Sequence, residues 1–160
     1  MKYLAIDLGA ESGRGVIGEI EGGRMRLTEA HRFPNVPVRV FDGLHWNILD
    51  LWAGVKTAIE RAARQGAPLA GIGVDSWAVD FGLVAPGPSG GLVGLPYHYR
   101  DGRTDGVMEQ AFEIVPRREI FWRTGIQFLQ FNTLYQLLAA KQREPWALEA
   151  SDRLLMIGEL

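Results

Sequence analysis

The first residues that could do chemistry lie where an apolar N-terminal segment ends. Asp7 follows Leu4-Ala5-Ile6, and a carboxylate in such a position can hold Mg²⁺ because hard cations prefer oxygen ligands. The tight turn after it carries small residues, a hydroxyl and a guanidinium, which can face phosphate oxygens. Its members are Ala10, Glu11, Ser12, Gly13 and Arg14. Taken alone, these residues fit a plain hairpin with Asp7 exposed at its end equally well.

A second candidate mixes acidic and aromatic side chains at the end of a later apolar segment. Asp75 and Asp80 lie five positions apart, and Trp77 and Phe81 accompany them. Sugars are bound by hydrogen bonds between hydroxyls and carboxylates and by aromatic faces against their C–H surfaces, so this mixture suits a polyol pocket. The spacing alone favours another interpretation, in which the acids cap turns and the aromatic rings fill the core.

A third candidate is the segment Tyr97–Thr104. Its Arg100 and Asp101 could grip a ligand, or they could pair across a loop, which is a common and weak surface interaction; the spacing favours the loop pair. The histidines of the chain are scattered without ligand spacing, so a zinc site is not expected. The sequence also lacks the third glycine of a dinucleotide-binding fingerprint.

The elements that must position these groups begin with three short apolar segments separated by turn residues. They are Lys2–Leu8, Arg14–Ile20 and Met25–Phe33. Short segments joined by tight turns predict an antiparallel meander. Residues 34–43, which contain two prolines, are expected to be a connector.

A helix is predicted next, capped by Asn47 and ended by Gly66 and Pro68. Apolar residues recur along it at helical spacing. They are Ile48, Leu51, Trp52, Val55, Ile59 and Ala62. The compact apolar segment 69–76 then predicts a strand, and strand–helix–strand predicts a crossover that packs the helix on the sheet.

The second half of the chain is predicted to open with a hairpin and then to become helical. Strands over Val79–Val84 and Leu92–Leu95 flank a tip rich in glycine and proline. Thr104 is the expected cap of one helix, Pro116 the start of a second, and residues 132–133 the start of a third. An apolar segment opens at residue 154, close to the last residue, so the chain is expected to be truncated.

The bulk properties indicate an ordinary globular domain. The chain has 160 residues, of which 47% are hydrophobic and 22% charged, with a formal net charge of −2. This balance gives no electrostatic reason to expect nucleic acid or a membrane surface as a partner. The absence of cysteine excludes disulfides and favours a cytoplasmic location. No apolar stretch approaches the ~20 residues of a membrane-spanning helix.

Taken in order, these motifs resemble the first part of the FGGY carbohydrate kinases, and within them the kinases that phosphorylate L-rhamnulose. The opening segment from Ala5 to Arg14 is similar to that family's first phosphate hairpin, and 72–81 to its sugar-site strand. Another signature is matched by 99–104. The most specific match is Thr124–Phe128 followed by Phe131–Leu137. The resemblance covers essentially the whole chain.

The resemblance implies an α/β fold of the ribonuclease-H-like kind, as in the actin/hexokinase superfamily, with a mixed sheet flanked by helices. Residues 1–160 would form an incomplete first lobe without the second, ATP-binding domain. The implied reaction is Mg²⁺-dependent transfer of the γ-phosphoryl group of ATP to the 1-hydroxyl of L-rhamnulose, a small sugar. The catalytic base of the family would lie downstream, so this chain alone is expected to be inactive.

The resemblance also assigns the individual residues. Asp7 would assist the metal, and residues 10–14 would form the phosphate-binding turn. Ala78 would contact the sugar, with Trp77, Asp80 and Arg100 as further substrate-site residues.

Two departures from the family pattern keep other readings open. Ala78 stands where the family usually has glycine, and its methyl group could narrow the pocket. Glu11 places a carboxylate in a turn meant for phosphates. A kinase for a related ketose such as L-fuculose or xylulose is therefore an alternative, and a non-catalytic sugar-binding module is another.

Overall fold

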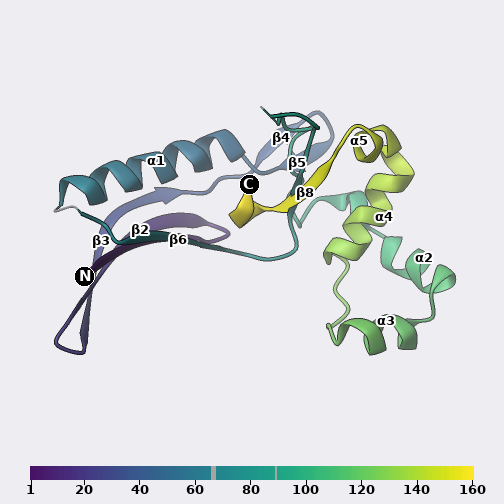
Figure 1. Cartoon of the computed structure of the whole chain (residues 1–160). Helices are drawn as coiled ribbons and strands as arrows, with labels where there is room; N and C mark the ends of the chain where they lie inside the picture. The colour runs from purple at the N-terminus through teal and green to yellow at the C-terminus, as the bar shows by residue number, and fades with distance from the viewer. Residues whose placement is uncertain (66–67, 89) are drawn as a thin grey trace. The chain divides into compact units, whose positions relative to one another are not determined.

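A computed structural model describes residues 1–65, 68–88 and 90–160 (Figure 1). The described chain divides into two compact units. The first contains residues 1–38, 46–78 and 157–160, and the second contains residues 39–45 and 79–156. The first unit has a four-stranded sheet, the second has two-stranded sheets, and each unit has its own cluster of buried apolar side chains.

The first unit is built on a four-stranded sheet in the order β3-β2-β1-β6. Strands β1 (Lys2–Leu8), β2 (Ser12–Glu21) and β3 (Arg24–Pro34) are antiparallel neighbours, so the predicted meander is confirmed. Strand β6 (Gly71–Ser76) lies parallel to β1 at the edge of the sheet. Helix α1 (Ile48–Arg64) connects the meander to β6, which confirms the predicted crossover.

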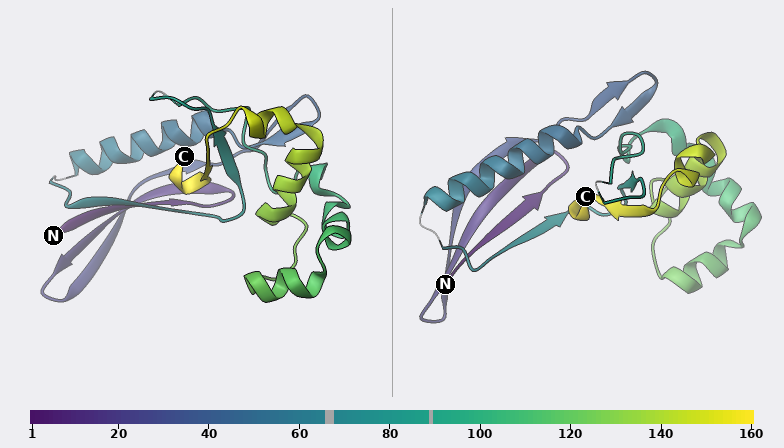
Figure 2. Two further views of the ribbon diagram at one scale, coloured as in Figure 1. Left: turned by 45° about the vertical axis from the view of Figure 1, so that its right-hand side comes forward. Right: turned by 45° about the horizontal axis from the view of Figure 1, so that its top comes forward.

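Helix α1 begins at its predicted cap, because the Asn47 side chain accepts a hydrogen bond from the backbone N–H of Asp50. The helix lies along one face of the sheet (Figures 1 and 2). Its buried face packs on the alternate residues of β1 that point toward it. The shared core contains Leu4, Ile6, Leu8, Leu51, Val55, Ala58 and Ala62. The predicted end of the helix at Gly66 lies outside the described residues.

The prediction that Trp52 belongs to the buried apolar stripe of α1 is wrong. Trp52 is 56% exposed, because it lies about 100° around the helix from the buried Leu51. Its ring is instead contacted by the ammonium group of Lys56 at 5.8 Å. Gly54, rather than Trp52, belongs to the buried face of α1. A search for periodic apolar side chains does not detect a glycine.

The helix approaches the sheet closely at a second glycine. A Cβ atom built on Gly15 of β2 would lie 2.7 Å from the Cβ of Ala58 in α1. Real Cβ contacts are longer, so any side chain at this position would push α1 off the sheet. Glycine at position 15 therefore sets the packing distance between α1 and β2.

The predicted connector contains a short two-stranded ladder. Strands β4 (Val38–Val40) and β5 (Gly43–His45) pair with each other, although Pro34 and the neighbouring proline at position 37 indicated irregular structure. Strands of this length carry too few residues for an alternation signal.

The second unit pairs β7 (Phe81–Val84) with β8 (Arg153–Met156) as antiparallel neighbours. The predicted strand over residues 92–95 is wrong, because only Leu92 forms an isolated bridge, to Val84. The expected partner of β7 was local in sequence, whereas the observed partner comes from the other end of the unit. The tip between Val84 and Leu92 includes position 89, which lies outside the described residues.

Helices make up the rest of the second unit. They are α2 (Val107–Ile114), α3 (Arg117–Thr124), α4 (Thr133–Arg143) and α5 (Pro145–Glu149). Two short 3₁₀ turns, η1 (Gly102–Thr104) in this unit and η2 (Ile157–Glu159) in the first, complete the described part of the chain. The predicted starts at Pro116 and at residues 132–133 are confirmed. None of the described helices is both long and apolar enough to cross a membrane.

Thr104 does not cap a helix, contrary to prediction. Asp101 caps η1 by accepting a hydrogen bond from the Arg103 N–H, and Thr104 is the buried last residue of that turn. Helix α2 begins after Gly106, whose φ of +74° is a left-handed conformation that favours glycine. The predicted helix start at Thr104 is therefore occupied by the 3₁₀ turn η1, and α2 begins three residues later, at Val107.

Candidate functional site

An ion pair joins the two strands that flank the predicted phosphate turn. Asp7 of β1 and Arg14 of β2 are register partners, so their side chains share one face of the sheet. The Nε and Nη2 atoms of Arg14 both lie 2.7 Å from Oδ2 of Asp7. The Asp7 side chain is 40% exposed and the Arg14 side chain 46%. The structure therefore brings the predicted metal ligand and the predicted phosphate arginine together within reach of a ligand.

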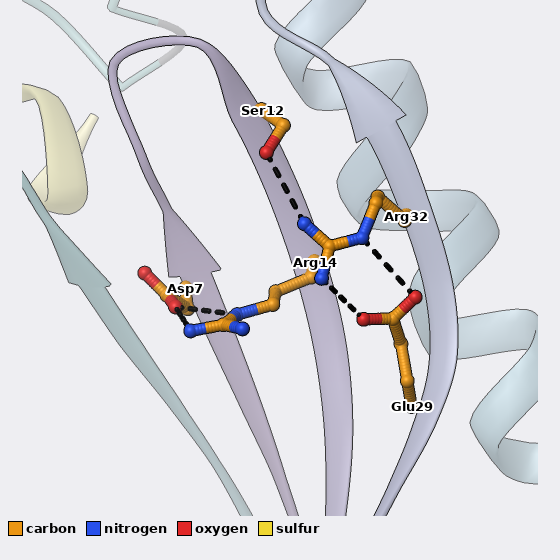
Figure 3. A network of polar contacts seen from close by, with 5 residues as sticks. All are labelled: Asp7, Ser12, Arg14, Glu29 and Arg32. Carbon is orange, nitrogen blue, oxygen red and sulfur yellow. Dashed lines mark hydrogen bonds and ion pairs between the residues drawn. The ribbon is translucent and has the colours of Figure 1, made fainter.

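The same face carries a second ion pair that the sequence interpretation missed. Arg32 of β3 is the register partner of Arg14, and its Nη2 lies 2.6 Å from Oε2 of Glu29. Its Nη1 lies 3.4 Å from the Ser12 hydroxyl. We call Asp7, Ser12, Arg14, Glu29 and Arg32 the polar face (Figure 3). Regular alternation along β3 would put Glu29 and Arg32 on opposite faces, and the register shift opposite Gly15 and Val16 brings them to one face.

The polar face is the sheet face that α1 does not cover. Leu4, Ile6 and Leu8 alternate with Asp7 along β1 and pack against α1, so Asp7 points the other way. In Figure 3, α1 lies behind the strands that carry the five side chains. Gly13, a predicted member of the phosphate turn, belongs to the α1 side, where it is buried against Phe33.

Arg32 controls the ionisation of its acidic partner. Its hydrogen bond to Glu29 is the largest influence and lowers the pKa of that carboxyl below its usual value, with a smaller contribution from the charge of Arg14. The reciprocal hydrogen bond raises the pKa of Arg32. Both groups stay charged at neutral pH, so the polar face presents two guanidinium groups whose charges are balanced by Asp7 and Glu29.

The turn between β1 and β2 is held by local backbone contacts. The Gly9 N–H donates to the Ser12 carbonyl at 3.0 Å, and a Cβ atom on Gly9 would lie 2.9 Å from that oxygen. Asn35 fastens the turn from outside, because its side-chain amide donates to the Gly9 carbonyl and its backbone N–H donates to the Glu11 carbonyl. Ala10 lies between these anchors, and the Glu11 side chain is exposed.

The surroundings of Asp7 suit a weakly held divalent cation. Asp75 is the register partner of Asp7 in the parallel pair of β1 and β6, so both carboxylates belong to the same sheet face. Within the described part of the chain, no three acidic or histidine side chains gather as a metal-binding group. Mg²⁺ commonly uses one or two carboxylates and takes its other ligands from substrate phosphates and water. The residues present fit that kind of site.

Trp77, a predicted substrate-site residue, rests on a second tryptophan in the first unit. Its ring centroid lies 4.1 Å from that of Trp46, which is fully buried. Trp77 itself is half-buried, and the adjacent Ala78 is exposed. Trp46 was missed in the sequence, where its place directly before the cap Asn47 was the available signal.

Asp80 and Arg100, in the second unit, differ sharply in exposure. Asp80 is 0% exposed, and its two carboxylate oxygens accept hydrogen bonds from the Gln136 side chain at 2.7 Å and from the Tyr99 N–H at 3.2 Å. Arg100 is exposed, with its guanidinium 5.3 Å from the Tyr99 ring centroid. Asp101 is engaged locally, because its oxygens accept from the backbone N–H groups of Leu44 and Arg103.

Gln136 connects the buried Asp80 to a buried arginine. The Arg103 Nη2 donates to Oε1 of Gln136 at 2.7 Å, and the Arg103 guanidinium lies 3.8 Å from the Tyr97 ring centroid. Burial is the main influence on the pKa of Arg103 and lowers it. Because a guanidinium only donates and a carboxylate only accepts, the amide of Gln136 has one possible orientation. The motif 131–137 pointed to a family but not to this contact.

His98 is a buried neutral base beside this network. Burial and then the nearby positive charge of Arg100 lower the pKa of His98 to about 4, while Asp101 opposes the shift. Its Nδ1 accepts a hydrogen bond from the Arg100 N–H at 3.0 Å. His98 therefore shapes the backbone at Arg100 as an uncharged ring.

Comparison with known proteins shows that the chain is similar to sugar kinases. No protein-family model matches it. A rhamnulokinase from Bacteroides thetaiotaomicron is 39% identical over 157 residues, which is 98% of this chain and 32% of that protein. A rhamnulokinase from Klebsiella pneumoniae is 41% identical over 159 residues, with the same two coverages. The solved structure of a ligand-bound xylulose kinase from Lactobacillus acidophilus matches with a TM-score of 0.79 at 14% identity, over 98% of this chain and 31% of that one.

These findings confirm two expectations from the sequence. The resemblance to carbohydrate kinases, and to rhamnulokinases in particular, extends over nearly the whole chain. The fold is that of the corresponding part of sugar kinases, a mixed sheet with helices of the ribonuclease-H-like class. The chain spans about a third of the length of the curated relatives it matches.

Proposed function

We propose that the protein containing this chain transfers the γ-phosphoryl group of ATP to the 1-hydroxyl of L-rhamnulose. The observation that carries the proposal is the polar face, with Asp7 and Arg14 paired at the phosphate turn, in a chain about 40% identical to rhamnulokinases. Phosphoryl transfer depends on positioning and on neutralising phosphate charge more than on covalent chemistry. A cytoplasmic location, where ATP is available, is part of the same proposal.

On the phosphate side, the polar face supplies charge and hydrogen-bond donors. Asp7, with Asp75 on the same sheet face, would hold Mg²⁺, which neutralises phosphate charge when bound. Arg14 and the turn 10–14 would contact the phosphate oxygens. Arg14 can exchange the Asp7 carboxylate for a phosphate because the pair is only half buried. Glu11, exposed on the turn, is left free to face solvent or the metal's water shell.

On the sugar side, we assign contact to Trp77 and Ala78 and support to Asp80. Ala78 is exposed beside a tryptophan that is stacked on Trp46, a suitable arrangement for the C–H face of a sugar. Asp80 is fully buried, so it serves the substrate site by fixing the backbone. Arg100 is exposed and charged, and it remains a candidate contact to a sugar hydroxyl. The catalytic base is assigned to the part of the protein outside this chain.

The test is ADP release from ATP and Mg²⁺ with L-rhamnulose, measured for the full-length protein beside the 160-residue chain. L-Fuculose and xylulose serve as comparison substrates. We expect turnover only in the full-length protein and fastest with L-rhamnulose. Preference for another ketose would overturn the substrate, and turnover by the short chain would move the base to the exposed Asp75. No turnover with any ketose, but sugar binding by calorimetry, would replace the kinase with a sugar-binding module.

A further inference from the structure

Val79 follows the proposed sugar-contact residue directly and has a conformation that valine avoids. Its φ is +77°, in the left-handed region, where a β-branched side chain meets its own backbone. Such residues persist only where surrounding contacts enforce the conformation, and they cluster at functional sites. Contacts around Val79 must therefore hold its backbone at positive φ.

The first turn of α4 supplies the holding contacts, all within the second unit. The Thr133 hydroxyl donates to the Val79 carbonyl at 2.9 Å. The Gln136 amide lies 3.2 Å from the same oxygen, but it is closer to Oδ1 of Asp80, at 2.7 Å, and to the Phe131 carbonyl, at 2.9 Å. An amide nitrogen has two hydrogens, so these shorter contacts engage Gln136 and leave Thr133 as the main donor to Val79.

The residue after Val79 is held equally firmly. Asp80 is fully buried and accepts from Gln136 and from the Tyr99 N–H. Arg103 fixes Gln136 in turn, by donating to its Oε1. The peptide on the C-terminal side of Val79 therefore has little freedom, and the φ of Val79 sets the orientation of the peptide that joins it to Ala78.

We propose that Thr133 and Gln136 are positioning residues for the ketose. They form the α4 clamp, which holds Val79 in its left-handed conformation and so fixes the peptide that joins Val79 to the proposed sugar-contact residue Ala78. Without the Thr133 hydroxyl, Val79 relaxes toward negative φ and the peptide between Ala78 and Val79 rotates. The inference rests on the proposed function for its choice of substrate, although the clamp itself is a structural claim.

The primary test compares Thr133→Val with Thr133→Ser in the full-length protein. Valine keeps the shape and removes the hydroxyl, whereas serine keeps the hydroxyl. Loss of one buried hydrogen bond corresponds to about a fivefold change in an equilibrium. We expect Thr133→Val to raise the KM for L-rhamnulose about fivefold without changing the KM for ATP, and Thr133→Ser to recover most of that loss. Thr57→Val is the matched control, because the Thr57 hydroxyl bonds its own helix backbone, at Ala53.

Repeating the Thr133→Val comparison in a Val79→Gly protein separates a positioning role of Thr133 from a general structural role. Glycine adopts positive φ as readily as negative φ, so in Val79→Gly the conformation no longer needs enforcement. We expect Thr133→Val to change the KM for the ketose less than twofold in that background. Equal effects in both backgrounds, or an equal rise in the KM for ATP, would overturn the clamp.

A crystal structure of the full-length Thr133→Val protein decides the matter without any assay. The proposal expects Val79 at negative φ or in two conformations, whereas an unchanged φ near +77° overturns it. Thermal unfolding of the same protein checks that it is folded. If the wild-type protein phosphorylates no ketose, the proposed function fails, but this crystal structure still supports or overturns the clamp.

Discussion

The polar face and the buried network around Gln136 use similar side chains for different purposes. Asp7 and Arg14 pair on an open sheet face, with 40% and 46% of their side chains exposed. Asp80 and Arg103 are buried and are joined through the neutral amide of Gln136. Exposed pairs change partners at little cost, whereas a buried charge that loses its partner is strongly destabilising. The difference in burial separates groups that meet a ligand from groups that hold others in place.

The largest effect on catalysis is expected from Asp7→Ala. Removing a carboxylate that positions Mg²⁺ weakens stabilisation of the transition state more than sugar binding. We expect kcat of the full-length protein to fall about 100- to 1000-fold, with the KM for L-rhamnulose changed less than about threefold. Steady-state kinetics at saturating ATP measures both values. An unchanged kcat would remove Asp7 from the mechanism and the polar face from the site.

The largest effect on stability is expected from Gln136→Leu. It leaves the buried Asp80 and Arg103 without the amide that connects them, which should cost about 2–3 kcal/mol and lower the midpoint of thermal unfolding. The matched control is Gln142→Leu on the same helix, whose amide makes an exposed bond to Gln110. Equal midpoints for the two variants would show that the buried network is no more important than a surface contact.

His98 gives a smaller effect that appears only in acid. Its pKa is about 4 in the folded protein, against an ordinary 6.5, so between these values the unfolded chain binds a proton that the folded chain does not. Stability should therefore fall as the pH drops from about 6.5 to about 4, and this contribution should change no further below pH 4. His98→Asn, which keeps an acceptor for the Arg100 N–H, should flatten that part of the profile. An NMR titration in which the His98 ring protonates near pH 6.5 would contradict this account.

The smallest effect is expected from Glu29→Gln on the polar face. Glu29 and Arg32 form an exposed pair, and such pairs contribute little to stability. We expect no measurable change in the thermal midpoint and less than a twofold change in the KM for ATP. A large rise in that KM would mean that Arg32 contacts the phosphates and needs Glu29 to hold its guanidinium in place.

The sequence predicted the first unit well because its signals are local. Turn residues between β1, β2 and β3 and the cap at Asn47 each act within a few positions. Errors arose where a distant partner decided the structure, as when β7 paired with β8 rather than with residues 92–95. Gly54 was missed in the buried face of α1 because a glycine carries no apolar side chain.

The site shows the same division between local and distant information. Asp7 and Arg14 could be proposed from their own segment, and the register of β1 and β2 then brought them together. The side-chain contacts of Asn35 with Gly9, of Trp46 with Trp77 and of Gln136 with Asp80 could not be assigned, because the residues of each pair are at least 26 positions apart. The sequence can thus indicate which residues meet a ligand more readily than which residues hold them.

The edge position of β6 has a practical consequence for work on the isolated chain. β6 ends the sheet order, and its Ile72 and Val74 are 51% and 50% exposed. A strand with an open hydrogen-bonding edge and exposed branched side chains is a template for pairing with another molecule. Light scattering should therefore accompany any assay of residues 1–160 alone, so that self-association is not mistaken for a missing active site.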